Sequence, residues 1–183
     1  STSAPPVATN AVEEMVAIPE AVDLDSESLL SLLEAEFAIR ARDYDFALQR
    51  LQHQVETIPD PELARRMLRL AQFTRQADAT LIAAGRVSDL DPSDAEASAL
   101  AAALAIESGD ILAAAQYAER ALLAGSDLNI AALLNDFNAQ DAKVRETLEA
   151  TINRLSEQID DPDIRFAKAL MLWRLGDGDA SRA

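Results

Sequence analysis

The chain has 183 residues, with 16 Lys and Arg against 32 Asp and Glu, and its formal net charge is −16 at pH 7. The absence of cysteine from the sequence excludes disulfides, cysteine-based zinc sites and a thiol nucleophile. The acidic balance argues against nucleic acid and against an anionic membrane surface, because both are bound through clustered Lys and Arg. With only five glycines and few β-branched runs, the composition favours an all-α protein rich in Ala and Leu.

Residues 1–25 form a tract of small residues and proline, which is typical of a flexible tether. Within the tract, Ala11–Ile18 places Val12, Met15 and Val16 on one side of a short helical pattern. Three interpretations stay open for this segment. It is a helix that docks into the groove of a partner, a helix that packs on the chain's own first repeat, or a segment without fixed structure.

Residues 26–183 show the apolar spacing of amphipathic helices, interrupted by short turns that recur. Three turns place an Asp before a Pro: Asp60-Pro61, Asp91-Pro92 and Asp161-Pro162. Asp60 and Asp161 suit N-caps with Pro at the first helical position, which starts a helix without losing a hydrogen bond. After Pro92, Ser93 with Glu96 is expected to form a capping box instead. The interval from Pro92 to Pro162 corresponds to two periods of about 35 residues, close to the length of a helix–turn–helix repeat.

A second set of turns has nearly the same period. These turns begin at Arg42, Gly109 and Gly176, and the two intervals between them are equal, each close to two periods of about 34 residues. We therefore predict helix–turn–helix units over residues 28–60, 61–93, 94–127 and 128–161, with the first helix of a fifth unit over 162–175. Because this fifth unit lacks its second helix, we expect the chain to be part of a longer protein.

The clearest unit, Ser108 to Leu122, resembles a tetratricopeptide repeat, with Gly109, Ala114 and Ala121 at the positions where that family has small residues. Arg42 to Pro59 resembles the second half of the same repeat. This resemblance implies an all-α fold in which helical hairpins stack as a right-handed α-solenoid. Two stretches depart from it: Gln76 to Thr80 lacks the expected Gly-Asp-Tyr and Ala, and the turn region Asn135 to Asp141 is polar and of uncertain register.

A narrower resemblance covers Ser28 to Asp94. Ser28–Ile39, Tyr44–Leu48 and Asp60–Arg66 are similar to the opening repeats of proteobacterial outer-membrane lipoproteins. The resemblance implies a lipid-anchored cysteine upstream of the tether and a periplasmic location. Some members of that family are adaptors that bind a carboxyl-terminal processing protease and help it to degrade cell-wall hydrolases, which makes such a protease a candidate partner here.

Candidate catalytic and metal-binding residues are few. His53 is the only histidine, and we expect it on a solvated helix surface, because a lone imidazole is a poor metal site. The acidic pairs around Asp161 and Asp177 lack the spacing of a calcium loop. No nucleophile has a base partner and no phosphate-binding loop occurs. The sequence therefore predicts no enzyme, no metal and no cofactor.

The stacked first helices would instead present a concave groove for protein or peptide partners. By repeat position, the groove residues are Leu29, Leu32, Glu36, Ile39, Arg40, Glu62, Arg65, Arg69, Gln72, Phe73, Glu96, Ala99, Ala103, Ile106, Glu107, Ile130, Leu133, Phe137, Phe166, Leu170 and Trp173. The candidate protein-binding residues among them are Arg65, Arg69, Gln72, Phe73, Glu36, Arg40 and Glu107.

Two features of this groove have alternative interpretations. Arg65 and Arg69 share a helix face and would grip a carboxylate or an acidic segment, or else they pair with neighbouring Glu and Asp. Phe166, Leu170 and Trp173 form an apolar stripe that packs against a following helix or lines a ligand pocket, and that would drive self-association if exposed.

The leading hypothesis is a non-catalytic scaffold in the periplasm, anchored to the outer membrane only through a lipid outside this chain. The alternatives are a cytoplasmic chaperone or assembly protein, the regulatory N-terminal part of a larger enzyme, and a self-assembling structural protein.

Overall fold

Helices make up the secondary structure of residues 24–180, the part of the chain that the computed structural model describes, with side-chain burial described through residue 176. No strand occurs within these residues. The eight α-helices and two short 3-10 helices are α1 (Ser26–Ala41), α2 (Tyr44–Thr57), α3 (Pro61–Thr74), α4 (Ala77–Leu90), α5 (Ala95–Ser108), α6 (Ile111–Leu123), η1 (Ile130–Leu134), η2 (Phe137–Ala139), α7 (Ala142–Gln158) and α8 (Pro162–Ala180).

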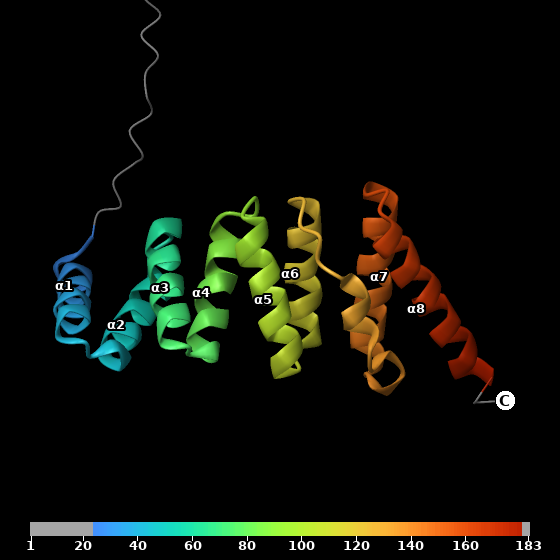
Figure 1. Cartoon of the computed structure of the whole chain (residues 1–183), viewed down its shortest axis with the longest axis horizontal. Coiled ribbons are helices and arrows are strands. Elements are labelled where there is room, and N and C mark those ends of the chain that lie inside the picture. Colours follow the sequence, from blue (N-terminus) through green and yellow to red (C-terminus); the bar gives the residue numbers. More distant parts are fainter. Residues whose placement is uncertain (1–23, 181–183) are drawn as a thin grey trace, which may run out of the picture.

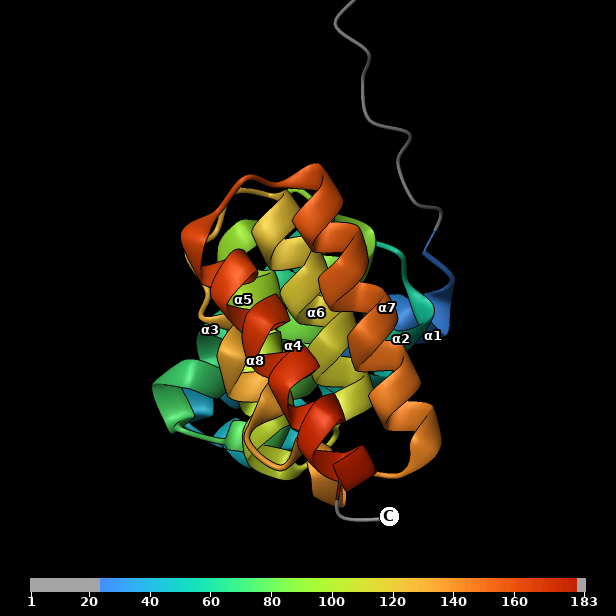
Figure 2. The same cartoon turned by 90° about the vertical axis from the view of Figure 1, so that its right-hand side faces the viewer.

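The helices follow one another in chain order along the long axis of the molecule (Figure 1). Viewed along that axis, they lie behind one another in a stack (Figure 2). Consecutive helices pack on one another, with α1 on α2, α3 on α4 and α5 on α6 inside the hairpins, and α2 on α3 and α4 on α5 between them. The protein is therefore all-α, and its first six helices form three antiparallel hairpins that resemble repeats.

The turns inside these hairpins share one conformation. The first helix of each hairpin ends at a residue in the left-handed region, namely Arg42 (φ 61°), Arg75 (φ 57°) and Gly109 (φ 81°). In each case the cap N–H donates to carbonyl oxygens of the preceding turn, as in a helix C-cap motif. Successive caps are separated by one repeat length of about 34 residues, so the period seen in the sequence is also a period of the backbone.

The second helices are tied together by three arginines that also recur at one repeat length, about 34 residues. Arg86 of α4 donates from Nε to the Val55 carbonyl oxygen of α2 at 2.9 Å. Arg120 of α6 pairs with Asp89 of α4. Arg154 of α7 forms a bidentate ion pair with Glu119 of α6, with Nε donating to Oε1 at 2.8 Å and Nη2 donating to Oε2 at 2.9 Å. We refer to Arg86, Arg120 and Arg154 as the arginine ladder.

Two clusters of buried side chains form the core. The first joins α1 to the start of α5 and runs from Ala35 to Ala97. The second runs from Ala102 to Met171 and joins the rest of α5 to α8. Alanines dominate where α5 meets α6, and the fully buried ones include Ala101, Ala105, Ala114 and Ala118. Methyl side chains let the two helix backbones approach closely, which explains why this hairpin tolerates so few large residues.

The predicted fourth helical pair is wrong. Its first helix is replaced by η1 and η2, and only α7 is a full helix. This stretch is rich in Asn and Asp, whose side chains bond nearby backbone groups and compete with helix formation, and the Asn129 side chain accepts from the Ala131 N–H at 3.0 Å. Ile130, Leu133 and Phe137, predicted to line the groove, are 0%, 2% and 0% exposed and belong to the core.

The predicted end of the last helix is also wrong. Helix α8 continues through Gly176 to Ala180 instead of turning after residue 175. Gly176 does not adopt a positive φ, in contrast to Gly109 and Gly125. A glycine inside a helix costs only about 1 kcal/mol relative to alanine, so it does not by itself end one. The predictions for the tether and for residues 11–18 lie outside the described residues.

Candidate functional site

The predicted groove residues fall at matching places on α1, α3 and α5. Arg40, Phe73 and Glu107 each stand two residues before the left-handed cap of their helix, and Glu36 and Arg69 each stand six residues before it. All five have exposed or partly exposed side chains. The period therefore places one cation, one aromatic ring and one carboxylate at equivalent positions along the stack.

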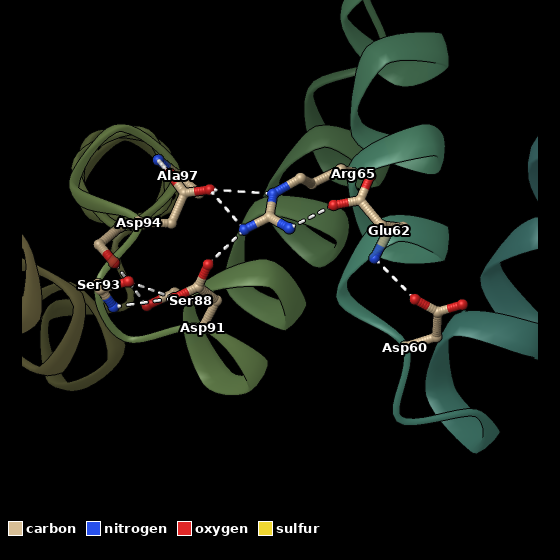
Figure 3. A network of polar contacts seen from close by, with 9 residues as sticks. Asp60, Glu62, Arg65, Ser88, Asp91, Ser93, Asp94 and Ala97 are labelled. Atoms are coloured by element: carbon tan, nitrogen blue, oxygen red, sulfur yellow. Dashed lines mark hydrogen bonds and ion pairs between the residues drawn. The ribbon is translucent and has the colours of Figure 1, made fainter. Parts of the chain in front are cut away.

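Arg65 is the centre of a polar network between α3 and the turn that joins α4 to α5 (Figure 3). Its Nη1 donates to Glu62 on its own helix at 2.7 Å. Its Nη2 donates to Asp91 at 2.5 Å and to Asp94 at 3.2 Å, and its Nε also donates to Asp94 at 3.2 Å. One guanidinium thus serves three carboxylates, and a quarter of the Arg65 side chain remains exposed.

The carboxylates of this network are themselves held in place. Asp94 is the N-cap of α5 and accepts from the Ala97 N–H at 3.0 Å. Asp91 accepts from the Ser93 hydroxyl at 2.5 Å, and this bond, followed by that from Arg65, lowers the pKa of Asp91. The bond to Glu62 is the main cause of the raised pKa of Arg65.

Arg65 therefore acts as a clamp that fastens α3 to the next hairpin. Arg66 is also engaged, because it pairs with Glu36 of α1. Of the two interpretations, pairing with neighbouring acids thus holds for Arg65, and Arg66 pairs in the same way. Arg69 is exposed and has no ion pair with any of the residues that the structure describes.

A pocket of about 170 Å³ opens beside this clamp, between α3 and α5. Its lining residues are Arg65, Leu68, Arg69, Gln72, Asp94, Glu96, Ala97 and Leu100. This lining combines the apolar side chains of Leu68, Ala97 and Leu100 with charged and polar ones, which suits one side chain of a bound segment. Three of the predicted protein-binding residues, Arg65, Arg69 and Gln72, meet here.

Phe73 lies apart from that pocket. Its ring packs edge-on against Tyr44, with 5.6 Å between the ring centroids, and is 70% exposed. The two rings border a second hollow of about 390 Å³ near the hairpin turns. Phe73 therefore offers an apolar contact beside the turn of the first hairpin, separate from Arg69.

An apolar face on α1 was not predicted from the sequence. Leu30, Leu33 and Phe37 are 58%, 47% and 66% exposed, and Leu29 beside them is 51% exposed. The available signal was that apolar residues surround α1 on nearly all sides, whereas a surface helix normally has one polar face.

Two further sequence expectations concern isolated side chains. His53 is exposed on α2, so the prediction of a solvated helix surface is confirmed. Phe166 and Trp173 on α8 are each 62% exposed, while Leu170 between them is partly buried in the second core cluster. No helix covers Phe166 or Trp173 within the described residues.

Over residues 24–180, no group of three or more His, Asp or Glu side chains is arranged to hold a metal ion. None of the helices in that range has both the length and the apolar character needed to cross a membrane. No protein-family model matches the chain, and no curated protein matches it. The fold and the site therefore identify a structural class only: an all-α, repeat-like protein with an exposed polar and aromatic surface.

Proposed function

We propose that the protein is a non-catalytic scaffold of the tetratricopeptide type, a right-handed α-solenoid that binds protein or peptide segments on its first helices. The observation that carries this proposal is the left-handed cap repeated at Arg42, Arg75 and Gly109. A period of about 34 residues with a helix–turn–helix unit is the signature of that repeat. Stacked repeats form extended surfaces that serve as binding sites.

Within the proposed surface, Arg69 and Phe73 are the anchors. Arg69 has an exposed guanidinium with no ion pair among the described residues, so it is available to a carboxylate of the bound segment. Phe73 adds a large exposed apolar area. Arg40 and Glu107 extend the surface to the neighbouring helices, whereas Arg65 holds the scaffold together.

The likeness of the first repeats to outer-membrane lipoproteins supports a narrower proposal. In it, the protein is a periplasmic adaptor that presents substrates to a carboxyl-terminal processing protease. The alternatives are a cytoplasmic assembly protein and the regulatory N-terminal part of a larger enzyme.

Affinity capture from periplasmic extract with the full-length protein tests the proposal, with captured proteins identified by mass spectrometry. We expect a processing protease and cell-wall hydrolases to be recovered. Arg69→Glu combined with Phe73→Ala removes both anchors, and we expect it to abolish recovery. Lys143→Glu on α7 is the matched control, because it makes the same charge change on an exposed side chain away from the first helices.

Equal recovery by the anchor variant and the control would place the binding surface elsewhere on the stack. Recovery of no periplasmic protein would contradict the adaptor proposal. Catalytic activity of the full-length protein would favour the enzyme alternative.

A further inference from the structure

The apolar face of α1, formed by Leu30, Leu33 and Phe37, has no covering element among the residues that the structure describes. The three residues are spaced three and four apart, so they form one stripe along the helix. A surface helix of a single-layer stack normally exposes polar residues there.

At the first position of this stripe, the equivalent residues on the next two hairpins are covered. Leu30 stands twelve residues before the left-handed cap of its helix, and Leu63 and Ala97 stand twelve residues before theirs. Leu30 is 58% exposed, whereas Leu63 is 8% and Ala97 is 3% exposed. Leu63 is buried in the same cluster as Leu51 and Val55 of the preceding second helix and Ile58 at the C-cap of that helix. Leu30, at the start of the stripe, is therefore placed where a preceding second helix would cover it.

The sequence ahead of α1 repeats the end of that covering helix. Met15-Val16-Ala17-Ile18-Pro19 matches Val55-Glu56-Thr57-Ile58-Pro59 in its two apolar positions and its proline. Val55 is 1% exposed and Ile58 is 7% exposed, so the matched positions are the ones that pack. One turn earlier, Ala11 corresponds to the buried Leu51, and Glu13 corresponds to the exposed His53.

We propose that residues 11–18 of this chain dock on Leu30, Leu33 and Phe37 as the last two turns of a preceding second helix. Seven residues, 19–25, join this segment to α1, and helix–helix connections in bundles span about 2–8 residues. Eight helical residues extend about 12 Å, which matches the stretch of α1 from Leu30 to Phe37. This proposal does not depend on which partners the scaffold binds.

The acidic charges on both surfaces should make this docking depend on ionic strength. Glu34 of α1 occupies the position that Met67 has on α3 and Ala101 has on α5, and both of those residues are buried. The Glu34 carboxylate instead forms an ion pair with Arg50 of α2 at 3.0 Å. Residues 1–25 contain no Lys or Arg, so an acidic segment approaches a helix that carries further Glu side chains. Salt screens such repulsion between exposed charges, and we expect the docked state to be favoured as ionic strength rises.

Cysteine cross-linking tests the proposal in the 183-residue chain, whose own sequence contains no cysteine to interfere. Ile18→Cys with Leu33→Cys joins the docking face to α1, and Ala17→Cys with Leu33→Cys is the matched control on the opposite face. The two loops differ by one residue, so a free tether closes both at equal rates. We expect the Ile18→Cys pair to form its intramolecular disulfide at least about tenfold faster. Equal rates would overturn the proposal, and a disulfide-linked dimer would assign the face to a second copy.

Hydrogen exchange of the α1 amides gives an independent measurement. We expect Met15→Asp with Ile18→Asp to speed exchange across Leu30 to Phe37 in α1. Val16→Asp with Ala17→Asp adds the same charge on the other side of the segment and should leave exchange unchanged. Identical exchange in both variants would show that the segment does not cover α1.

Discussion

Gly85 of α4 lies directly against the phenol of Tyr117 on α6. A Cβ built on Gly85 would meet Tyr117 Oη at 2.5 Å and Cζ at 3.0 Å, closer than side chains normally pack. The contact joins the second helices of neighbouring hairpins next to the arginine ladder. Burial, and then the nearby Asp89 carboxylate, raises the pKa of Tyr117, as expected for a phenol enclosed between helices.

Gly85→Ala is therefore expected to destabilise the protein although alanine is the better helix former. Overpacking costs about 1–3 kcal/mol and the gain in helix propensity is about 1 kcal/mol, so we expect a net loss of about 1 kcal/mol in the free energy of unfolding. Chemical denaturation measures it. Gly176→Ala is the matched control, because Gly176 lies in α8 with nothing within 4 Å of a built Cβ, and it should stabilise the protein. Stabilisation by both variants would show that Tyr117 moves aside freely.

The left-handed caps give a pair of substitutions with opposite expected signs. Gly109→Ala puts a side chain at φ 81° and should cost about 1 kcal/mol of stability. Arg75→Gly relieves the same strain at φ 57° and should stabilise by up to about 1 kcal/mol, reduced by the greater freedom of glycine in the unfolded chain. Thermal unfolding of the two variants checks this. A loss of stability in Arg75→Gly would mean that the Arg75 side chain contributes more than its backbone strain costs.

These caps also show what the sequence alone could and could not reveal. The period is visible from Arg42 and Gly109, and the all-α class from composition and helical spacing. The middle turn looks like a departure because Arg75-Gln76 lacks glycine, yet the backbone there matches its neighbours. Packing of α3 against α4 imposes the left-handed conformation, and a strain of about 1 kcal/mol is too small to be evident in local sequence preference.

Arg65→Gln is expected to cost about 1–2 kcal/mol of stability, because three carboxylates lose a shared, partly buried cation. Arg69→Gln, one helical turn further on, serves as the control. Arg69 is exposed and without an ion pair among the described residues, so that change should stay within about 0.5 kcal/mol. Equal effects of the two variants on urea unfolding would contradict the role of Arg65 as a clamp.

The same network predicts a pH dependence. The pKa of Asp91 is lowered in the folded state below its ordinary value of 3.8, so the folded form binds this proton less readily than the unfolded form. The resulting stabilisation is complete above the ordinary pKa and is lost as the pH falls through the lowered one. As the pH falls below about 4, Arg65→Gln should therefore lose less stability than the unmodified protein. Parallel acid titrations of the two proteins, monitored by unfolding, would detect the difference in slope.

Truncation to alanine should lower the stability of the protein strongly at Phe137 and hardly at all at Trp173. Phe137 is fully buried in the second core cluster, and Phe137→Ala should cost about 3–5 kcal/mol. Trp173 is 62% exposed, and Trp173→Ala should change stability by no more than about 0.5 kcal/mol. As the only tryptophan in the sequence, Trp173 also reports its own environment, and acrylamide should quench its fluorescence readily. Poor quenching would show that another surface covers α8.

Only some residues of the candidate site could be predicted from the sequence. Repeat position correctly put Arg69 and Phe73 on the exposed side of α3, but it extended the groove to Phe137, where a polar stretch breaks the helix and the ring turns into the core. Two of the three carboxylate partners of Arg65, Asp91 and Asp94, lie 26 and 29 residues away in sequence, and only the packing of hairpins brings them to Arg65. The apolar face of α1 escaped notice because its exposure depends on which helix precedes it.

The division of the core into two clusters has a consequence for synthesis on the ribosome. Every buried member of the first cluster lies between Ala35 and Ala97, so none of its partners comes from α6 or later. The buried residues of this first cluster can pack together while α6 and the later helices are still being translated. Domains generally fold as units, N-terminal first, during translation. Each hairpin that leaves the ribosome later can therefore pack on a surface whose own core is already complete.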